Sequence, residues 1–188
     1  MNGTLRLSDK PDPRAGRAPE MTDEERRQYI SLLHTHPEQY LRIAEETIRK
    51  YPSDSQGYED CADYYVDMGQ YDEALRYFNK GSVLNPDRIV IPFERATILQ
   101  RAGRYQDALQ AFDACQQDEQ WLGDILYANR ATCYAKLGDL EAALAQCAKI
   151  ADDYHSYSAY GEFGGSKAQI IDTVRRVASA VRKDQPHG

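Results

Sequence analysis

Three glycines recur at an almost constant interval along the middle of the chain. Gly69 and Gly103 are 34 residues apart, and Gly103 and Gly138 are 35 apart. Each is followed at matching distances by an alanine and then by a phenylalanine or a cysteine. A fixed period of this length is typical of a repeat array, in which each copy is a small unit that stacks on the next. We therefore predict three successive copies, each a pair of helices joined at the glycine: residues 55–88, 89–122 and 124–157.

Small and large side chains occupy equivalent positions in the three copies. Alanines stand at one position of each predicted helix, in the pairs Ala62 and Ala74, Ala96 and Ala108, and Ala131 and Ala143. Such small residues let paired helices cross closely, while a ring or leucine beside them fills the remaining space. The glycines end the first helix of each pair, where a positive φ angle costs glycine little.

The first copy resembles the tetratricopeptide repeat (TPR) at its signature positions. These positions are Tyr58, Cys61, Ala62, Tyr65, Gly69, Ala74, Phe78, Gly81 and Pro86. The resemblance implies an all-α fold, a right-handed superhelical TPR solenoid of helix-turn-helix units. It also implies that the second face of each first helix lines a concave, partner-binding surface.

The segments on either side of the three copies differ in character. Residues 1–20 are rich in proline and glycine and predict a flexible N-terminal tail. Residues 21–54 predict a degenerate N-terminal helical hairpin, with a capping box at Thr22 and Glu25, one helix to about His34 and a second from about Glu38. Residues 158–188 predict a loop followed by a C-terminal capping helix from Ser166. Its apolar residues recur at intervals of three and four: Ile170, Ile171, Val174, Val177, Ala178 and Val181.

Two departures from the repeat pattern have structural consequences. Gln120 stands where a proline would close the second copy, so the 115–124 connection is expected to be irregular. Arg95 and Arg130 occupy a position that is usually apolar. We expect each to lay its methylene groups along the core edge and keep its guanidinium in solvent.

Composition narrows the functional class. The net charge of -7 argues against a general nucleic-acid binder, which needs a basic surface. No apolar run is long enough to span a membrane and no secretion signal is recognisable, so a cytoplasmic protein without membrane insertion is expected. The four cysteines form no C-x-x-C pair and fall in predicted helices, which favours reduced thiols in the core.

Catalytic and metal-binding patterns are weak in this sequence. His34 and His36 flank a turn without a third ligand nearby, so we predict no metal site. No serine or cysteine lies in a recognisable nucleophile motif, and no cofactor is implied. An enzyme would also need a closed pocket, which an open array of hairpins rarely supplies, so we expect no catalytic activity.

The predicted function is capture of a segment of another protein in the groove. Glu59, Asp60, Asp63 and Asp67 make one end of the lining acidic, so the partner segment, extended or helical, should be basic at one end. Phe93 is the expected aromatic anchor. The residues predicted to contact the partner are Glu59, Asp63, Phe93, Thr97, Arg101, Asn129, Thr132 and Lys136.

Three more specific alternatives remain open from the sequence. Residues 125–139 are similar to TPR domains whose carboxylate clamp grips the acidic C-terminal tails of heat-shock chaperones, and Asn129 matches one clamp residue. Short chains of about three TPR units with an N-terminal helical segment also resemble bacterial chaperones of secreted translocator proteins. An immunity or inhibitor protein that blocks one enzyme is the third alternative.

Overall fold

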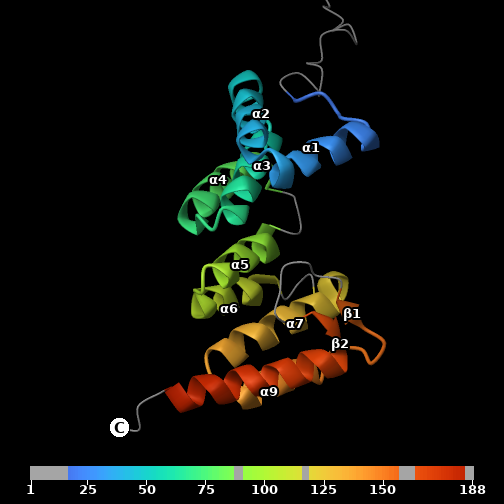
Figure 1. Ribbon diagram of the computed structural model, residues 1–188, viewed down its shortest axis with the longest axis vertical. Coiled ribbons are helices and arrows are strands. Elements are labelled where there is room, and N and C mark those ends of the chain that lie inside the picture. The colour runs from blue at the N-terminus through green and yellow to red at the C-terminus, as the bar shows by residue number, and fades with distance from the viewer. Residues whose placement is uncertain (1–16, 87–90, 116–118, 157–163, 185–188) are drawn as a thin grey trace, which may run out of the picture. The chain divides into compact units, whose positions relative to one another are not determined.

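The computed structural model describes residues 17–86, 91–115, 119–156 and 164–184 (Figure 1). Helices account for nearly all of the regular structure in these ranges, which confirms the predicted all-α repeat class. The chain divides into two compact units, Met1–Pro86 and Asp87–Gly188. This division falls beside the expected junction of the first two repeat copies.

The first unit contains four consecutive helices, each packed on the next. Their bounds are α1 Asp23–Thr35, α2 Pro37–Lys50, α3 Gln56–Asp67 and α4 Tyr71–Leu84. Pro37 begins α2, where its missing N–H needs no partner. Ala62 of α3 and Ala74 of α4 are buried at the α3–α4 crossing, beside Phe78.

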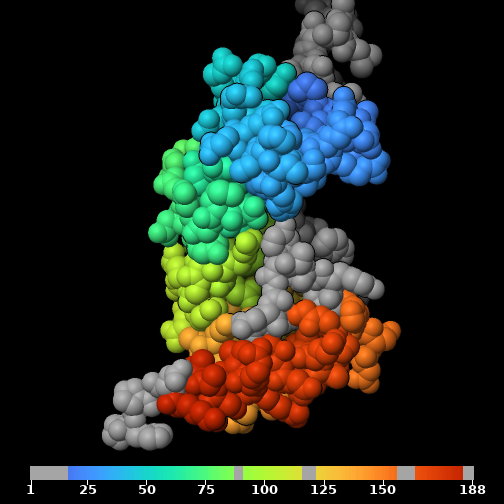
Figure 2. All heavy atoms as spheres, viewed as in Figure 1, coloured from blue at the N-terminus to red at the C-terminus, as the bar shows by residue number. Residues whose placement is uncertain are grey.

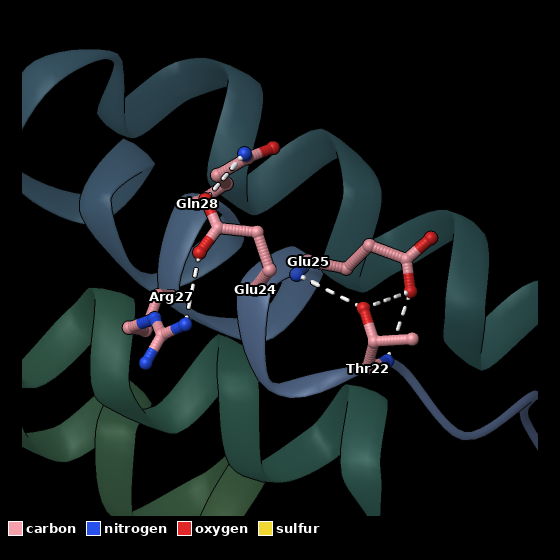
Figure 3. Close-up of polar contacts among 5 residues, drawn as sticks. All are labelled: Thr22, Glu24, Glu25, Arg27 and Gln28. Carbon is pink, nitrogen blue, oxygen red and sulfur yellow. Dashed lines mark hydrogen bonds and ion pairs between the residues drawn. The ribbon is translucent and has the colours of Figure 1, made fainter.

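A capping box starts α1, as the sequence predicts (Figure 3). The Glu25 N–H donates to the Thr22 hydroxyl at 3.3 Å, and the Thr22 N–H donates to a Glu25 carboxylate oxygen at 2.9 Å. On the next turn, Arg27 and Gln28 both donate to Glu24. These exposed contacts fix where α1 begins, while its inward residues join α2 and α3.

The second unit contains five helices and a short ribbon within its described residues. The helices are α5 Ile91–Arg101, α6 Tyr105–Asp113, α7 Glu119–Lys136, α8 Leu140–Cys147 and α9 Lys167–Asp184. Successive helices from α5 to α8 pack on one another, and α5 also contacts α7. The chain then returns so that α9 lies along α7 and α8.

The apolar stripe of α9 closes the core of the second unit. Ile170, Val174 and Ala178 have no exposed surface, and they pack with Ala131 and Cys147. The opposite side of α9 faces solvent, and the atoms of this helix are red in Figure 2. Packing of this helix on the last helix pair is what the sequence pattern predicts.

A two-stranded ribbon precedes α9 and is absent from the sequence prediction. Strand β1, His155–Ser156, pairs antiparallel with β2, Gly165–Ser166. Gly165 has a φ of +99°, which only glycine adopts without strain. Strands this short carry no recognisable alternation, so the segment reads as a loop in the sequence.

The three repeat glycines adopt the predicted left-handed conformation. Their φ angles are +70° at Gly69, +75° at Gly103 and +81° at Gly138. Gly123 also has a positive φ, +48°, and it breaks α7 with a non-helical kink. The connection before the third copy is therefore irregular, as expected, although residues 116–118 lie outside the described residues.

All four cysteines are free and buried, as predicted. Cys61 lies in the first unit, and Cys115, Cys133 and Cys147 lie in the second. Burial raises the pKa of Cys61 and that of Cys133 to about 12. At neutral pH these thiols are therefore protonated and poorly nucleophilic.

The predicted flexible tail, residues 1–20, lies mostly outside the described residues. Residues 17–20 have no regular structure, and the Ala18 N–H donates to the Asp54 carboxylate at 2.8 Å. The aromatic residues Tyr157 and Tyr160 also lie outside the described ranges.

Candidate functional site

The exposed acidic face of the first unit runs along α3. Asp63 is exposed and Glu59 is partly buried, and both make polar or electrostatic contacts within the chain. Asp67, one turn further, lies 3.6 Å from Nδ1 of His34 on α1. The predicted contacts Glu59 and Asp63 therefore lie one turn apart on a helix with a solvent-facing acidic side.

Asp60 does not belong to this face, which corrects the sequence interpretation. Only 6% of the surface of Asp60 is exposed. The carboxylate accepts hydrogen bonds from Gln56 Nε2 at 2.8 Å, from the Tyr29 hydroxyl at 3.1 Å and from the Tyr40 hydroxyl at 3.4 Å. Donors from α1, α2 and α3 thus bind one buried acid. In the sequence, Asp60 cannot be distinguished from the surface carboxylates beside it.

The three hydrogen bonds to Asp60 all come from neutral donors. Burial raises the pKa of Asp60, and the hydrogen bonds from Gln56 and Tyr29 lower it in part. The rings of Tyr29 and Tyr40 stack with centroids 4.5 Å apart. Burial also raises the pKa of both phenols, so they remain hydrogen-bond donors to the acid.

In the second unit, α5 and α7 lie side by side and carry the other six predicted contacts. Gln100 Nε2 on α5 donates to the backbone carbonyl of Asn129 on α7 at 3.3 Å. The ring of Phe93 on α5 is partly buried and packs against Phe112, with centroids 5.6 Å apart. Phe112 is fully buried, so the Phe93 ring lies against the core of the second unit.

The polar side chains of this pair of helices bond to their own backbones. Thr97 donates to the Glu94 carbonyl at 2.7 Å, Thr132 to the Ala128 carbonyl at 2.9 Å, and Asn129 Nδ2 to the Ile125 carbonyl at 2.8 Å. A hydroxyl that donates in this way still has oxygen lone pairs for an incoming donor. These three residues are thus suited to accept hydrogen bonds from a ligand.

Arg101 and Lys136, the two predicted cationic contacts, lie at the C-terminal ends of α5 and α7. Both are partly buried, and both make polar or electrostatic contacts within the chain. Cations at helix C-termini are favoured by the helix dipole. A ligand that binds Arg101 or Lys136 would therefore interact with a cation that already contacts other groups of the chain.

The expected second face of the α7 segment is only partly exposed. Ala128 and Ala135 belong to the buried core shared with α9. Ile125, on the same predicted face, is 42% exposed. Because α9 covers part of this side of α7, the surface open to a partner is narrower than the repeat pattern alone suggests.

Arg130 is buried, and the prediction of a solvated guanidinium is wrong for it. Its side chain is 8% exposed, and Nη2 donates to the Phe112 carbonyl at 3.1 Å and to Asp113 Oδ1 at 2.7 Å. Carbonyls at the end of a helix lack intrahelical donors, and Arg130 supplies a donor to one of them, the Phe112 carbonyl near the end of α6. Arg95, by contrast, is exposed as expected.

The predicted contacts thus form two sets. Six of them lie on α5 and α7, two helices of the second unit that contact each other. Glu59 and Asp63 lie on α3 of the first unit.

Over the described ranges, no group of three or more His, Cys, Asp and Glu side chains could hold a metal ion. No helix in those ranges is long and apolar enough to cross a bilayer.

The helices form pairs that are joined at glycines with positive φ and that bury alanines where they cross. These features define the chain as an all-α helical repeat protein. The family model of the tetratricopeptide repeat matches residues 56–88, the span of α3 and α4. The chain therefore contains a tetratricopeptide repeat at these residues. Repeats of this family generally mediate protein–protein interactions and are typically not catalytic.

Comparisons with known proteins agree with this assignment. Tetratricopeptide repeat protein 37 of Xenopus laevis is 33% identical over 82 residues, which are 39% of this chain and 5% of that protein. Superkiller complex protein 3 of Mus musculus is 37% identical over 65 residues, which are 35% of this chain and 4% of that protein. The chain therefore matches only a small fraction of the length of these relatives.

The fold is similar to that of a solved bacterial protein. MamA residues 41 to the end, from Desulfovibrio magneticus RS-1, superposes with a TM-score of 0.57 at 18% identity, covering 89% of this chain and all of that one. A MamA RS-1 double mutant gives a TM-score of 0.58, also at 18% identity, over 88% of this chain. At this identity the likeness concerns the fold.

Proposed function

We propose that this protein binds a segment of a partner protein on the side of α5 and α7 that carries the six predicted contacts. The observation that supports this most is the Gln100–Asn129 hydrogen bond, which joins the two helices. The helices that carry these six residues are therefore already in contact before a partner binds. A preformed surface of this kind loses little conformational entropy on binding.

The proposed surface combines an apolar anchor with hydrogen-bond acceptors. Phe93 packs against the buried Phe112, and Ile125 adds exposed apolar area on α7. Buried rings of this kind usually supply most of the affinity of a protein interface, while the surrounding polar groups set orientation. Arg101 and Lys136 complete the set at the helix ends.

Glu59 and Asp63 on α3 are proposed as a second set of contacts, for the basic part of the partner. Their support is the acidic side of α3, which includes Asp67. Charges on the rim of an interface act mainly on association rate and register. Charge reversal at these two positions should therefore slow association more than it speeds dissociation.

Capture from the lysate of the source organism, with quantitative mass spectrometry, tests this proposal. Wild type is compared with Phe93→Ala and with the double variant Glu59→Lys, Asp63→Lys. The matched control is Glu20→Lys, Glu45→Lys, which makes the same charge change at exposed positions. The proposal predicts that one captured partner protein is lost from both test variants and retained by the control. Equal recovery of that partner by wild type, both test variants and the control would rule the proposal out.

A further inference from the structure

The solvent side of α9 carries a concentrated positive charge. Its four exposed cations are Arg175, Arg176, Arg182 and Lys183, here called the α9 basic face. They form two adjacent pairs, separated by seven positions. With a rise of about 1.5 Å per residue, seven positions return to nearly the same side of the helix about 10 Å further along its axis. The red surface in Figure 2 belongs to this helix.

These cations have few anionic neighbours. Asp172 lies 3.8 Å from Nη1 of Arg175, and both side chains are largely exposed, so this pair is weak. Arg176, Arg182 and Lys183 make no ion pair with any carboxylate whose side chain the structure describes. The apolar side of α9 packs in the core of the second unit. A positive surface in a protein of net charge -7 is therefore available for an outside anion.

Arg182 is held in place before any ligand arrives. Its Nε donates to the Gly138 carbonyl at 2.9 Å, in the turn between α7 and α8. That bond uses none of the Nη groups, which can still donate to an anion. A guanidinium fixed in this way loses less side-chain freedom on binding than an arginine that moves freely in solvent.

We propose that the α9 basic face binds an acidic segment of a partner protein through its carboxylates. Three of the four cations are arginines, whose planar fork matches a carboxylate with two parallel hydrogen bonds. The two cation pairs fit two acidic pairs about 10 Å apart, which a helical partner segment presents at positions seven residues apart.

Two other anionic partners fit this face less well. Insertion into a membrane surface needs large apolar side chains beside the cations. The large exposed apolar residues among the described residues lie on other segments, and none is on α9. Binding to nucleic acid depends on release of counterions by an extensively basic surface, and the rest of this chain is acidic.

Fluorescence anisotropy with a defined probe tests the inference. The probe is a labelled, alanine-rich helical peptide with two Glu-Glu pairs seven residues apart. A second peptide of the same composition places its pairs five residues apart, on opposite sides of a helix. At low ionic strength we expect the full-length protein to bind the first peptide about tenfold more tightly than the second.

Charge reversal locates the binding surface. Arg175→Glu with Arg176→Glu should weaken binding of the first peptide by about tenfold or more. The control Arg42→Glu with Arg49→Glu makes the same charge change at exposed positions of α2 and should weaken it less than about threefold. Arg182→Lys keeps the charge but loses the bond to Gly138 and should give an intermediate loss. Circular dichroism and thermal unfolding establish that each variant is folded.

Four outcomes overturn the inference. They are equal affinity for the two peptides, no binding of either, equal loss in the α2 control, and tighter binding of duplex DNA or of phosphatidylserine vesicles through the same arginines. The residues tested here differ from those of the proposed α5–α7 surface. Failure of one proposal is therefore distinguishable from failure of the other.

Discussion

Ala74 and Ala108 have no exposed surface, and each lies where the two helices of a hairpin cross. A leucine at either position must displace its neighbours, because protein interiors have almost no spare volume. We expect Ala74→Leu or Ala108→Leu to lower the free energy of unfolding by about 1–3 kcal/mol. Urea unfolding followed by circular dichroism measures this change.

The control for that measurement is Ala145→Leu, the same substitution at an exposed position of α8. Leucine is almost as good a helix former as alanine, so this variant should unfold within about 0.5 kcal/mol of wild type. A similar loss of stability in all three variants would show that the crossings are not tightly packed.

Asp60 gives the first unit an unusual pH dependence. Its pKa is raised in the folded state by burial, whereas it is about 3.9 in the unfolded chain. The folded state therefore binds the proton of Asp60 more tightly than the unfolded chain does. The stability that protonated Asp60 contributes is complete below the unfolded pKa and is lost as pH rises through the folded pKa. Asp60→Asn cannot ionise, so the variant does not lose this stability as pH rises.

We expect Asp60→Asn to gain stability relative to wild type as pH rises from acid to neutral. Thermal unfolding across that range measures the difference, with Asp63→Asn as the control at an exposed carboxylate on the same helix. The opposite trend, in which the advantage of Asp60→Asn shrinks with rising pH, would mean that the hydrogen bonds from Tyr29, Tyr40 and Gln56 outweigh burial.

Residue periodicity predicted the packing alanines and the buried cysteines correctly, because both depend on positions within one helix. It missed the environment of Asp60, because the hydroxyls that bind this acid come from Tyr29 and Tyr40 on two other helices. It also placed Arg130 at the surface. The Phe112 carbonyl and the Asp113 carboxylate that bind its guanidinium can be identified only when α6 and α7 are seen together.

At the scale of single elements, the start of α1 depends on Thr22. Its hydroxyl accepts the Glu25 N–H, a group that otherwise has no partner in the first turn. Thr22→Ala should cost about 0.5–2 kcal/mol of helix stability, whereas Thr22→Ser keeps the hydroxyl and should cost much less. Amide hydrogen exchange of the first turns of α1 measures both effects. Equal exchange rates in the two variants would show that the cap contributes nothing.

The repeat turns offer a matched pair of glycines. A Cβ added at Gly69 would meet no atom within 4 Å, whereas one at Gly138 would lie 3.1 Å from Cγ1 of Val181 on α9. Gly69→Ala should therefore cost about 1–2 kcal/mol, from the left-handed backbone alone. Gly138→Ala should cost more, because it adds a close contact with α9. Chemical unfolding compares the two, and a smaller loss at Gly138 would contradict this account.

Helices were predictable because their period, caps and glycine stops are local features. The β1–β2 ribbon was not, since two residues per strand show no alternation and the pairing joins segments ten positions apart. The sequence predicted that α9 packs on the last helix pair, but it did not predict how much of α7 the helix covers. The burial of Ala128 and Ala135 follows from how α9 lies along α7, which periodicity does not specify.

At the scale of the whole molecule, the distribution of the thiols makes the opening of each unit measurable. Cys61 reports on the first unit, and Cys133 is one of three reporters on the second. Both are buried with raised pKa values, so alkylation requires that the surrounding helices open. Alkylation followed by mass spectrometry therefore measures the two units separately.

We expect Ala74→Leu to accelerate alkylation of Cys61 by about tenfold and to affect Cys133 much less. Ala108→Leu should do the reverse. Equal acceleration at both cysteines in both variants would indicate that the chain opens as one cooperative unit.

The buried acid of α3 also limits how these repeats can be recombined. A hairpin transplanted from another array in place of α1 and α2 would remove the two phenol donors and leave the buried Asp60 carboxylate with Gln56 as the one remaining donor of the three described. Tyr29, Tyr40 and Asp60 should consequently be inherited together, and lineages in which the acid has become apolar should carry phenylalanine at both ring positions. Engineers who shuffle modules of this kind would need to move the three residues as a set.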